Sequence, residues 1–250
     1  MKPEDLAPTA PAPDAPLEAH DEFEEWDDTP TALGLRALFT LLAGGFLLWA
    51  QWHATINPGQ EYARWVWLSV IANFLLPACI VWLFFAQTLR HIPEIPNQAM
   101  NAWNYGWNYS DWKKQLRLSL ILFAVMLPFL WFASRDANVR AGYSQWFPAA
   151  TGSAFLINLA LLAVYLFCWE WFFRGFLLFG IAQGVAWPVA VVLQAVLFGF
   201  AHWGKPVMEM WGAFGGGAIL GVIAWREKSF LTAFLTHYFV HAAWVVLIRI

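Results

Sequence analysis

Seven long, predominantly apolar stretches constrain this chain more than any other feature of its sequence. A helix needs about 20 predominantly apolar residues to cross the hydrocarbon core of a bilayer. Inside a bilayer the backbone N–H and C=O groups must bond within their own segment, so we expect helices. The sequence therefore predicts an all-α, polytopic transmembrane helix bundle of about seven spans. The stretches cover about residues 33–52, 65–87, 116–133, 153–181, 187–203, 208–225 and 229–249.

The composition agrees with a membrane protein and leaves little room for a separate soluble domain. Hydrophobic residues make up 60% of the chain and charged residues only 12%, whereas about a quarter of a soluble domain is charged. The two cysteines, Cys79 and Cys168, both fall in predicted spans, so we expect buried thiols and no disulfide framework. The expected partners are the lipid bilayer and a membrane-tethered protein or peptide, with no nucleic acid.

The N-terminal segment differs from the rest of the chain. Residues 1–31 are rich in Pro, Ala, Asp and Glu, a composition that cannot bury enough apolar surface to fold. We therefore expect a disordered acidic tail over 1–31 and a transmembrane domain over 32–250. The segment lacks the basic region and apolar core of a signal peptide. A small excess of Lys and Arg in alternate connections favours a cytoplasmic N-terminus and so a cytoplasmic tail.

A small set of ionisable side chains interrupts the last four spans. Such groups cost several kcal/mol at bilayer depth and usually face a cavity or one another. Several lie four residues apart and so share a helix face. Their number in one part of the chain indicates a functional site. They are Glu170, Arg174, His202, Glu209, His237 and His241.

Each of these residues also has a purely structural interpretation. Glu170 and Arg174 could form an ion pair that fixes helix packing, and His202 could be a hydrogen-bonded residue at the end of a span. His237 and His241 have the spacing of two metal ligands on one helix, or of one base and one hydrogen-bond donor. Glu209 could extend towards the interface. Residues of these types can together hydrolyse a peptide bond without a covalent nucleophile, because carboxylate and imidazole can activate water.

Three short motifs resemble those of the CPBP family of intramembrane proteases. They are EWFFRG at 170–175, FGFAH at 198–202 and a His-bearing last span. The family includes the CAAX prenyl endopeptidase and bacterial bacteriocin-processing and self-immunity proteins, and its motifs are EExxxR, FxxxH and HxxxN. Their order and spacing match this chain across about residues 150–250, which the resemblance implies is the catalytic core.

The first motif matches with one departure. Glu170 stands at its second Glu and Arg174 at its Arg, but Trp169 occupies the first Glu position, which is thought to activate water in the CAAX enzyme. Either Glu170 takes that role or the chain is an inactive relative. The stretch HWGKPVME resembles a single-Glu bacterial subset that includes myxosortase-like sorting proteases, which adds Lys205 and Glu209 as secondary or substrate-binding candidates.

The other two motifs give the remaining candidates. Phe198 and His202 match the second motif, His237 matches the third, and His241 stands where the family usually has Asn. Family members have been described both as glutamic proteases and as metalloproteases. We expect the glutamic type without a cofactor, because no strong ligand set is visible; the alternative is Zn²⁺ held by His202, His237 and His241.

The resemblance implies an intramembrane endopeptidase of the cell (inner) membrane that cleaves near a protein's C-terminus. Glu170 and His202 would activate the water. His237 and His241 would stabilise the oxyanion, and Arg174 would orient the carboxylate. Two alternatives stay open: a non-catalytic member acting in immunity or as a scaffold, and a proton-coupled transporter, although no internal repeat of the transporter type is visible.

One geometric condition has to be met for this site to assemble. His202 lies at the end of its apolar stretch, whereas Glu170 and His237 lie well inside theirs. Straight helices of full length would place these side chains at different depths. We therefore expect the 187–203 helix to be short, tilted or deeply placed, or the break at 204–206 to dip into the membrane, as irregular backbone can where it lines a cavity.

Overall fold

The computed structural model describes residues 30–54, 58, 60–88, 105–144, 147, 148 and 150–249, and within these ranges the chain is helical with no strand. The expected tail over residues 1–31 lies outside the described residues, apart from its last two residues, which begin the first helix. The elements are α1 Pro30–Trp52, α2 Tyr62–Val70, the π-helix η1 Ile71–Leu75, α3 Leu76–Thr88, α5 Trp112–Ala133, α6 Ala137–Ser144, α7 Gly152–Trp171, the π-helix η2 Phe172–Leu177, α8 Leu178–Ile181, α9 Trp187–Phe200, α10 Val207–Glu227 and α11 Leu231–Leu247.

All seven apolar stretches are helical, as the sequence predicts, and the fold is a polytopic membrane bundle. Five helical segments are long and apolar enough to cross a membrane. The two others, α9 and α11, are apolar but have only 14 and 17 residues. The five long segments are Pro30–Trp52, Tyr62–Phe84, Trp112–Ala133, Gly152–Ile181 and Val207–Glu227.

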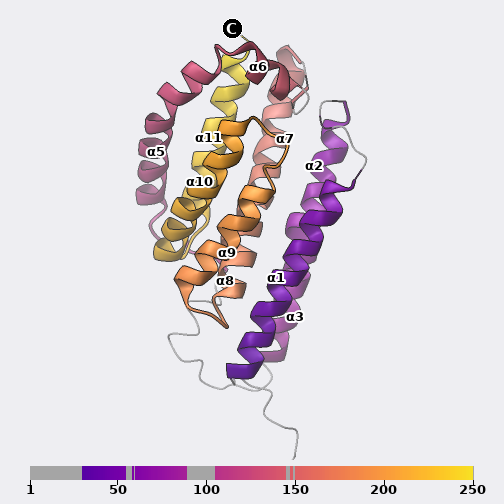
Figure 1. Ribbon diagram of the computed structural model, residues 1–250, viewed down its shortest axis with the longest axis vertical. Coiled ribbons are helices and arrows are strands. Elements are labelled where there is room, and N and C mark those ends of the chain that lie inside the picture. Colours follow the sequence, from indigo (N-terminus) through magenta and orange to yellow (C-terminus); the bar gives the residue numbers. More distant parts are fainter. Residues whose placement is uncertain are drawn as a thin grey trace, which may run out of the picture.

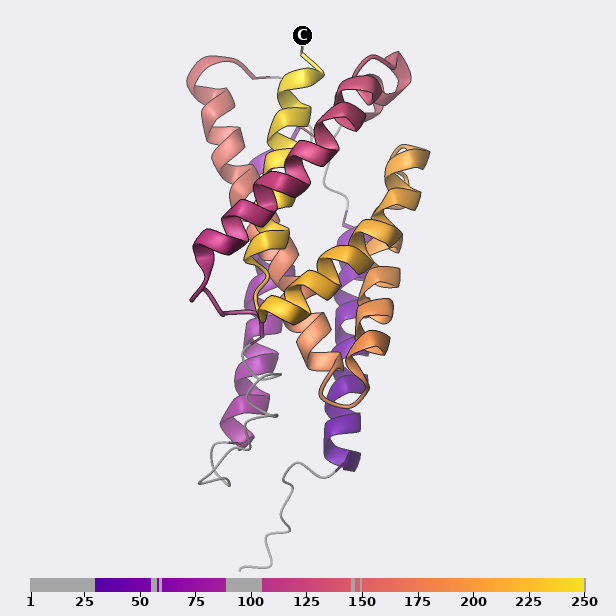
Figure 2. The ribbon, with the colours of Figure 1, turned by 90° about the vertical axis from the view of Figure 1, so that its left-hand side faces the viewer.

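The helices form two groups that meet along α7 and α8. Figure 1 shows α1, α2 and α3 together at one side and α5 to α11 at the other. The first group joins the second through contacts of α1 with α8 and of α2 with α7. Within the second group α9 packs on α10, and Figure 2 shows α5 crossing the outer side of α11. The segment 150–249 therefore forms the centre of the bundle.

The central helix is interrupted by a π-helical turn at the EWFFRG motif. α7 continues directly into η2 and then into α8, and Arg174 lies within η2. Single π turns inside α-helices are frequent at functional sites. The adjoining Gly175 has no room for a side chain, since a Cβ there would lie 2.7 Å from the carbonyl oxygen of Tyr105 and 2.5 Å from the ring of Trp171. The glycine thus lets the segment that begins at Tyr105 pack directly on η2.

The short helix α9 meets the geometric condition set by the sequence. It ends at Phe200, and the turn over residues 201–206 contains Gly204 with a φ of +85°. Figure 1 shows α9 ending below the upper ends of α7 and α11. The expectation of a short helix is confirmed, and the ring of Phe198, near the end of α9, lies 6.1 Å from that of His237 in α11.

The glycines of α10 divide between two faces. Gly217 and Gly221 face α9. A Cβ at Gly217 would meet Ala195 and Phe198, and a Cβ at Gly221 would meet Gln194. The positions of Gly212, Gly215 and Gly216 are open. The small residues at 217 and 221 let the two helices approach closely. The side chain of Gln194 uses this proximity, because its Nε2 donates to the carbonyl oxygen of Gly217 at 2.8 Å.

Candidate active site

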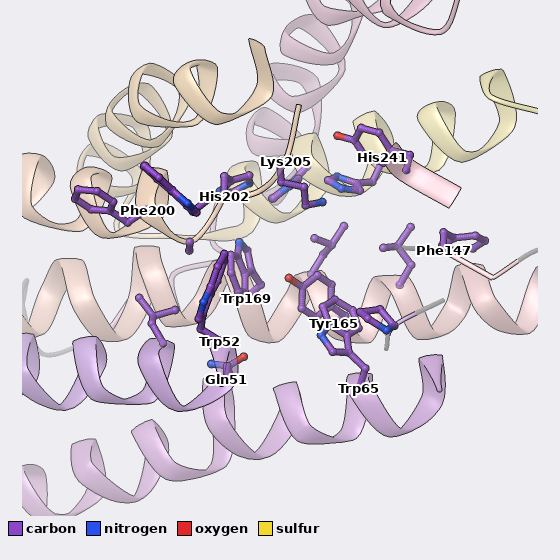
Figure 3. A pocket seen from close by; sticks show the side chains of 18 of the residues that line it. Gln51, Trp52, Trp65, Phe147, Tyr165, Trp169, Phe200, His202, Lys205 and His241 are labelled. Carbon is purple, nitrogen blue, oxygen red and sulfur yellow. The ribbon is translucent and has the colours of Figure 1, made fainter. Parts of the chain in front are cut away.

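A cavity of about 510 Å³ lies between the two groups of helices. α1 and α2 form one wall, and the turn after α9 and α11 form the opposite wall. α7 lies between these two walls (Figure 3). Aromatic rings supply much of the lining. Its main polar side chains are Gln51, Tyr165, His202, Lys205, His237 and His241. Three of the sequence-predicted histidines are thus brought together on one cavity.

Glu170 and Arg174 form a fully buried ion pair behind this cavity. Both side chains are 0% exposed, and Arg174 Nη1 lies 2.8 Å from Glu170 Oε2. The guanidinium also stacks on the ring of Phe198, with its central carbon 4.0 Å from the ring centroid. A buried carboxylate needs such a cation to remain ionised, because desolvation penalises an isolated charge. The pair as a whole is neutral, and Arg174 keeps the Glu170 carboxylate ionised.

The carboxylate of Glu170 reaches the cavity only through His237. His237 Nδ1 donates to Glu170 Oε1 at 2.5 Å, and the imidazole of His237 lines the cavity. Glu170 itself is fully buried and is not part of the lining. The reason is its position on α7, where Trp169 takes the place beside the cavity and the next residue turns towards Arg174. With its Nδ1 donating, neutral His237 carries its lone pair on Nε2.

His202 has the same tautomer for a different reason. Its Nδ1 lies 2.7 Å from the carbonyl oxygen of Phe198. A carbonyl oxygen only accepts, so Nδ1 carries the hydrogen and Nε2 is the unprotonated nitrogen in the neutral ring. Both His202 and His237 lie against the ring of Phe198, at centroid distances of 4.5 and 6.1 Å. Two imidazoles therefore offer basic nitrogens to one cavity.

His241 lies one helical turn beyond His237, at a ring distance of 4.7 Å, and also lines the cavity. Its Nδ1 is buried and makes no hydrogen bond within the part of the chain that the structure describes. Among the described residues no group of three His, Cys, Asp or Glu side chains is placed to hold a metal ion. The set His202, His237 and His241 does not fit Zn²⁺ in this arrangement, and we derive no step through a metal.

Lys205 and Glu209 lie at the edge of the site rather than at its centre. Lys205 lines the cavity and its Nζ is 3.7 Å from Glu209 Oε1. Tyr143 of α6 donates its hydroxyl hydrogen to Glu209, and Lys205 Nζ lies 5.0 Å from the centroid of the Tyr143 ring. Glu209 is not in the lining. These contacts tie α6 to the start of α10 and hold Lys205 at one end of the cavity.

Trp169, the residue at the first Glu position, forms part of the cavity wall. Its ring lies 6.2 Å from that of His202 in an edge-on arrangement and 5.0 Å from that of Phe173 (Figure 3). An indole at this position offers no carboxylate to the cavity. The acid–base groups among the lining residues are imidazoles, phenols and the amine of Lys205, and Glu170 lies one residue further along the helix.

Sequence reasoning missed the polar groups contributed by uncharged residues. Gln51 of α1 and Asn73 of η1 exchange two amide hydrogen bonds, at 2.8 and 3.1 Å, and Gln51 lines the cavity. Tyr165 of α7 lines it as well. Amides inside two apolar stretches were the available signal for the first pair. For Tyr165 the signal was its position one turn before Trp169, which puts both rings on one face of the helix.

Comparison with known families assigns the segment that carries this geometry. Residues 150–243 match the family model described as type II CAAX prenyl endopeptidase Rce1-like. The matched segment begins two residues before α7 and ends within α11. It includes Glu170, Arg174, His202, His237 and His241. Comparisons with curated proteins and with solved structures each give no match.

Proposed function

We propose that this chain is an intramembrane endopeptidase of the CAAX type, because its Rce1-like segment at residues 150–243 supports membership of the CPBP family of membrane proteases. It would hydrolyse a peptide bond in a membrane-tethered protein, near the C-terminus of that substrate. The substrate position and the cell (inner) membrane location rest on the family resemblance. We also place the chain in the single-glutamate subset, because Trp169 occupies the first Glu position.

The observation that carries the proposed mechanism is the contact between Glu170 and His237. A carboxylate buried beside Arg174 accepts a hydrogen bond from His237 Nδ1, and the other face of that imidazole lines the cavity with His202. This is the arrangement in which a buried carboxylate orients an imidazole base and stabilises the imidazolium that forms. Glu170 is therefore a positioning residue for His237, and Arg174 keeps it ionised.

The reaction needs a water between the two basic nitrogens and the substrate carbonyl carbon. His237 or His202 takes a proton from this water at Nε2 while the water oxygen bonds to the carbonyl carbon. The resulting tetrahedral intermediate collapses, the C–N bond breaks, and the proton on Nε2 passes to the leaving amine. Water is consumed, one carboxylate and one amine are formed, and no covalent enzyme intermediate is required.

The test is a comparison of newly formed protein termini in membranes of cells that carry the wild-type chain or a variant at matched expression. Glu170→Gln and His237→Gln should both remove the same defined set of termini. His53→Gln is the matched control, because His53 is exposed at the end of α1 and lies outside the cavity. Loss of a common set in the two site variants alone would identify the substrate together with the mechanism.

The rival functions predict other outcomes. If the termini are identical in wild-type and Glu170→Gln membranes while every wild-type phenotype persists, the chain acts without catalysis, in immunity or as a scaffold. Proton-driven solute flux into liposomes that depends on Glu170 would instead favour a transporter. Either result would overturn the proteolytic function.

A further inference from the structure

The proposed reaction creates an oxyanion, and the two basic histidines are poorly suited to bind it. His202 and His237 both commit the hydrogen on Nδ1 to an acceptor outside the cavity. In their neutral forms they therefore offer lone pairs, not hydrogens, to the substrate. Whichever one accepts the proton of water needs it again for the leaving amine. Hydrogen-bond donors for the oxyanion have to come from another side chain of the cavity.

Three tyrosines line this cavity, and their hydroxyl groups differ in what they bind. The hydroxyl of Tyr143 donates to Glu209. The hydroxyl of Tyr62 is buried and makes no hydrogen bond within the described residues. The hydroxyl of Tyr165 makes no hydrogen bond within the described part of the chain and is not buried. Tyr165 thus brings a phenol donor to the cavity with no protein acceptor assigned to it.

The ring of Tyr165 is held in place on both sides. Its centroid lies 4.1 Å from that of Trp65 on α2 and 5.5 Å from that of Trp169 on its own helix. In Figure 3 the Tyr165 hydroxyl points from α7 towards the wall that carries His202, Lys205 and His241. A donor fixed in this way pays little reorganisation when charge develops, which is the condition for strong oxyanion stabilisation.

The position of Tyr165 among the cavity residues supports the same role. Tyr165 lies on α7 one turn before Trp169, and both line the cavity together with His202, His237 and Lys205. The ammonium group of Lys205 faces a carboxylate at 3.7 Å. A substrate carbonyl set between His202 and His237 would therefore meet Tyr165 as a neutral donor from the side of α7.

We propose that Tyr165 is a further catalytic residue, whose hydroxyl hydrogen binds the oxyanion of the tetrahedral intermediate. This inference rests on the proposed endopeptidase function. Tyr165→Phe removes only the hydroxyl and keeps the ring between its two tryptophans. The loss of one such donor lowers kcat by about 10²- to 10³-fold, and KM should change little because the oxyanion exists only after water adds.

The experiment measures cleavage by the full chain in detergent or liposomes, using the peptide segment identified by its new termini. Tyr109→Phe is the control, since Tyr109 lies exposed before α5 and is not part of the cavity lining. A second readout is the affinity for the same peptide with a phosphinate in place of the scissile amide. Tyr165→Phe should weaken this analogue about as much as it lowers kcat/KM, an effect that a purely structural role of the hydroxyl would not produce.

The outcomes distinguish the role of Tyr165 from the endopeptidase function on which it rests. Full activity and unchanged phosphinate affinity in Tyr165→Phe, with an inactive His237→Gln, would overturn the role of Tyr165 and leave the endopeptidase intact. A wild-type chain that cleaves nothing would overturn both. If Tyr165→Phe lowers the melting temperature severely, 3-fluorotyrosine at position 165 keeps the ring and the hydroxyl. Its more acidic phenol should then raise kcat, and an unchanged kcat would contradict the proposal.

Discussion

The guanidinium of Arg174 rests on the ring of Phe198, 4.0 Å from its centroid. The same ring lies 4.5 Å from the imidazole of His202, and the carbonyl oxygen of Phe198 accepts the hydrogen of His202 Nδ1. One residue of α9 therefore holds a charged side chain of η2 through its ring and sets the tautomer of a histidine through its backbone. This explains why a Phe four residues before a His belongs to the site.

Replacing Phe198 by Leu should lower activity while the fold persists. The ring is buried and its contact with Arg174 is desolvated, a setting in which cation–π attraction reaches about 2 kcal/mol. Movement of Arg174 and His202 would cost about tenfold or more in kcat/KM, since about 1.4 kcal/mol corresponds to a factor of ten. Phe132→Leu, at a position 76% exposed on α5, is the control. Equal activity of the two variants in a cleavage assay would contradict this role of Phe198.

The Glu170–Arg174 pair should separate stability from catalysis. Glu170→Gln leaves the buried guanidinium without its counter-charge, which typically costs about 3–5 kcal/mol. In the double variant Glu170→Gln with Arg174→Met no unpaired charge is buried, so much of the stability should return. Activity should not return, because the carboxylate that orients His237 is still missing. Thermal unfolding in detergent and cleavage of the same preparations measure the two effects, and a double variant that regains activity would exclude this role for Glu170.

Gly175→Ala should disturb the site through packing. The new Cβ would lie 2.7 Å from the carbonyl oxygen of Tyr105, and that backbone cannot rotate away as a side-chain end can. We expect a loss of stability of about 1–3 kcal/mol, as for other overpacked sites, together with lower activity because Arg174 precedes the glycine. Gly212→Ala on α10 meets open space and should be neutral or slightly stabilising. Similar melting temperatures for both variants would argue against the close approach at Gly175.

Chelation should leave the enzyme active. The described residues contain no group of three ligands that could hold a metal, and the basic nitrogens of His202 and His237 are used here to activate water. We expect purified protein to hold less than one equivalent of Zn²⁺ and to keep its cleavage rate after dialysis against EDTA. Loss of activity that added Zn²⁺ restores, with one equivalent bound, would establish the zinc mechanism instead.

Tyr105 should make the protein less stable at alkaline pH. Burial raises the pKa of its hydroxyl to about 12 from 10.0, because the phenolate would be desolvated beside Gln183, whose Nε2 lies 2.6 Å from the hydroxyl oxygen. Above pH 10 the unfolded chain loses this proton while the folded chain keeps it, so stability falls as pH rises from about 10 to about 12, by about 2–3 kcal/mol in total. Tyr105→Phe should show a shallower decline than wild type over that window. Parallel unfolding curves would contradict the assignment.

The helices were predictable because bilayer physics leaves so few choices. An apolar stretch of about 20 residues such as 33–52 has to satisfy its own backbone, and it does so as α1. The two π turns could not be predicted in this way, because they differ from α-helix by one residue of register and carry no compositional signal. The lengths of α9 and α11 depended on where neighbouring helices end, which is a property of packing.

The sequence predicted which residues form the site better than it predicted how they are arranged. Ionisable residues stand out against an apolar background, so Glu170 and the three histidines were found from the sequence. Spacing within one helix could not tell which of Trp169 and Glu170 faces the cavity, since adjacent residues point about 100° apart and the partner helices decide. Tyr165 was missed because an aromatic residue in a membrane helix is common and its hydroxyl gains meaning only beside His202 and His237.

The shortness of α9 also has a consequence for the surrounding lipid. At 1.5 Å per residue its 14 residues rise about 21 Å, against a hydrocarbon core of about 30 Å. Its outer face carries Val189, Val192 and Val196, all exposed on the helix, so acyl chains rather than protein must cover it. Lipid beside α9 has to thin or tilt to meet the turn at 201–206. Water and headgroups are thereby brought down towards His202, and the thickness of the membrane becomes one of the variables that set the turnover of the enzyme.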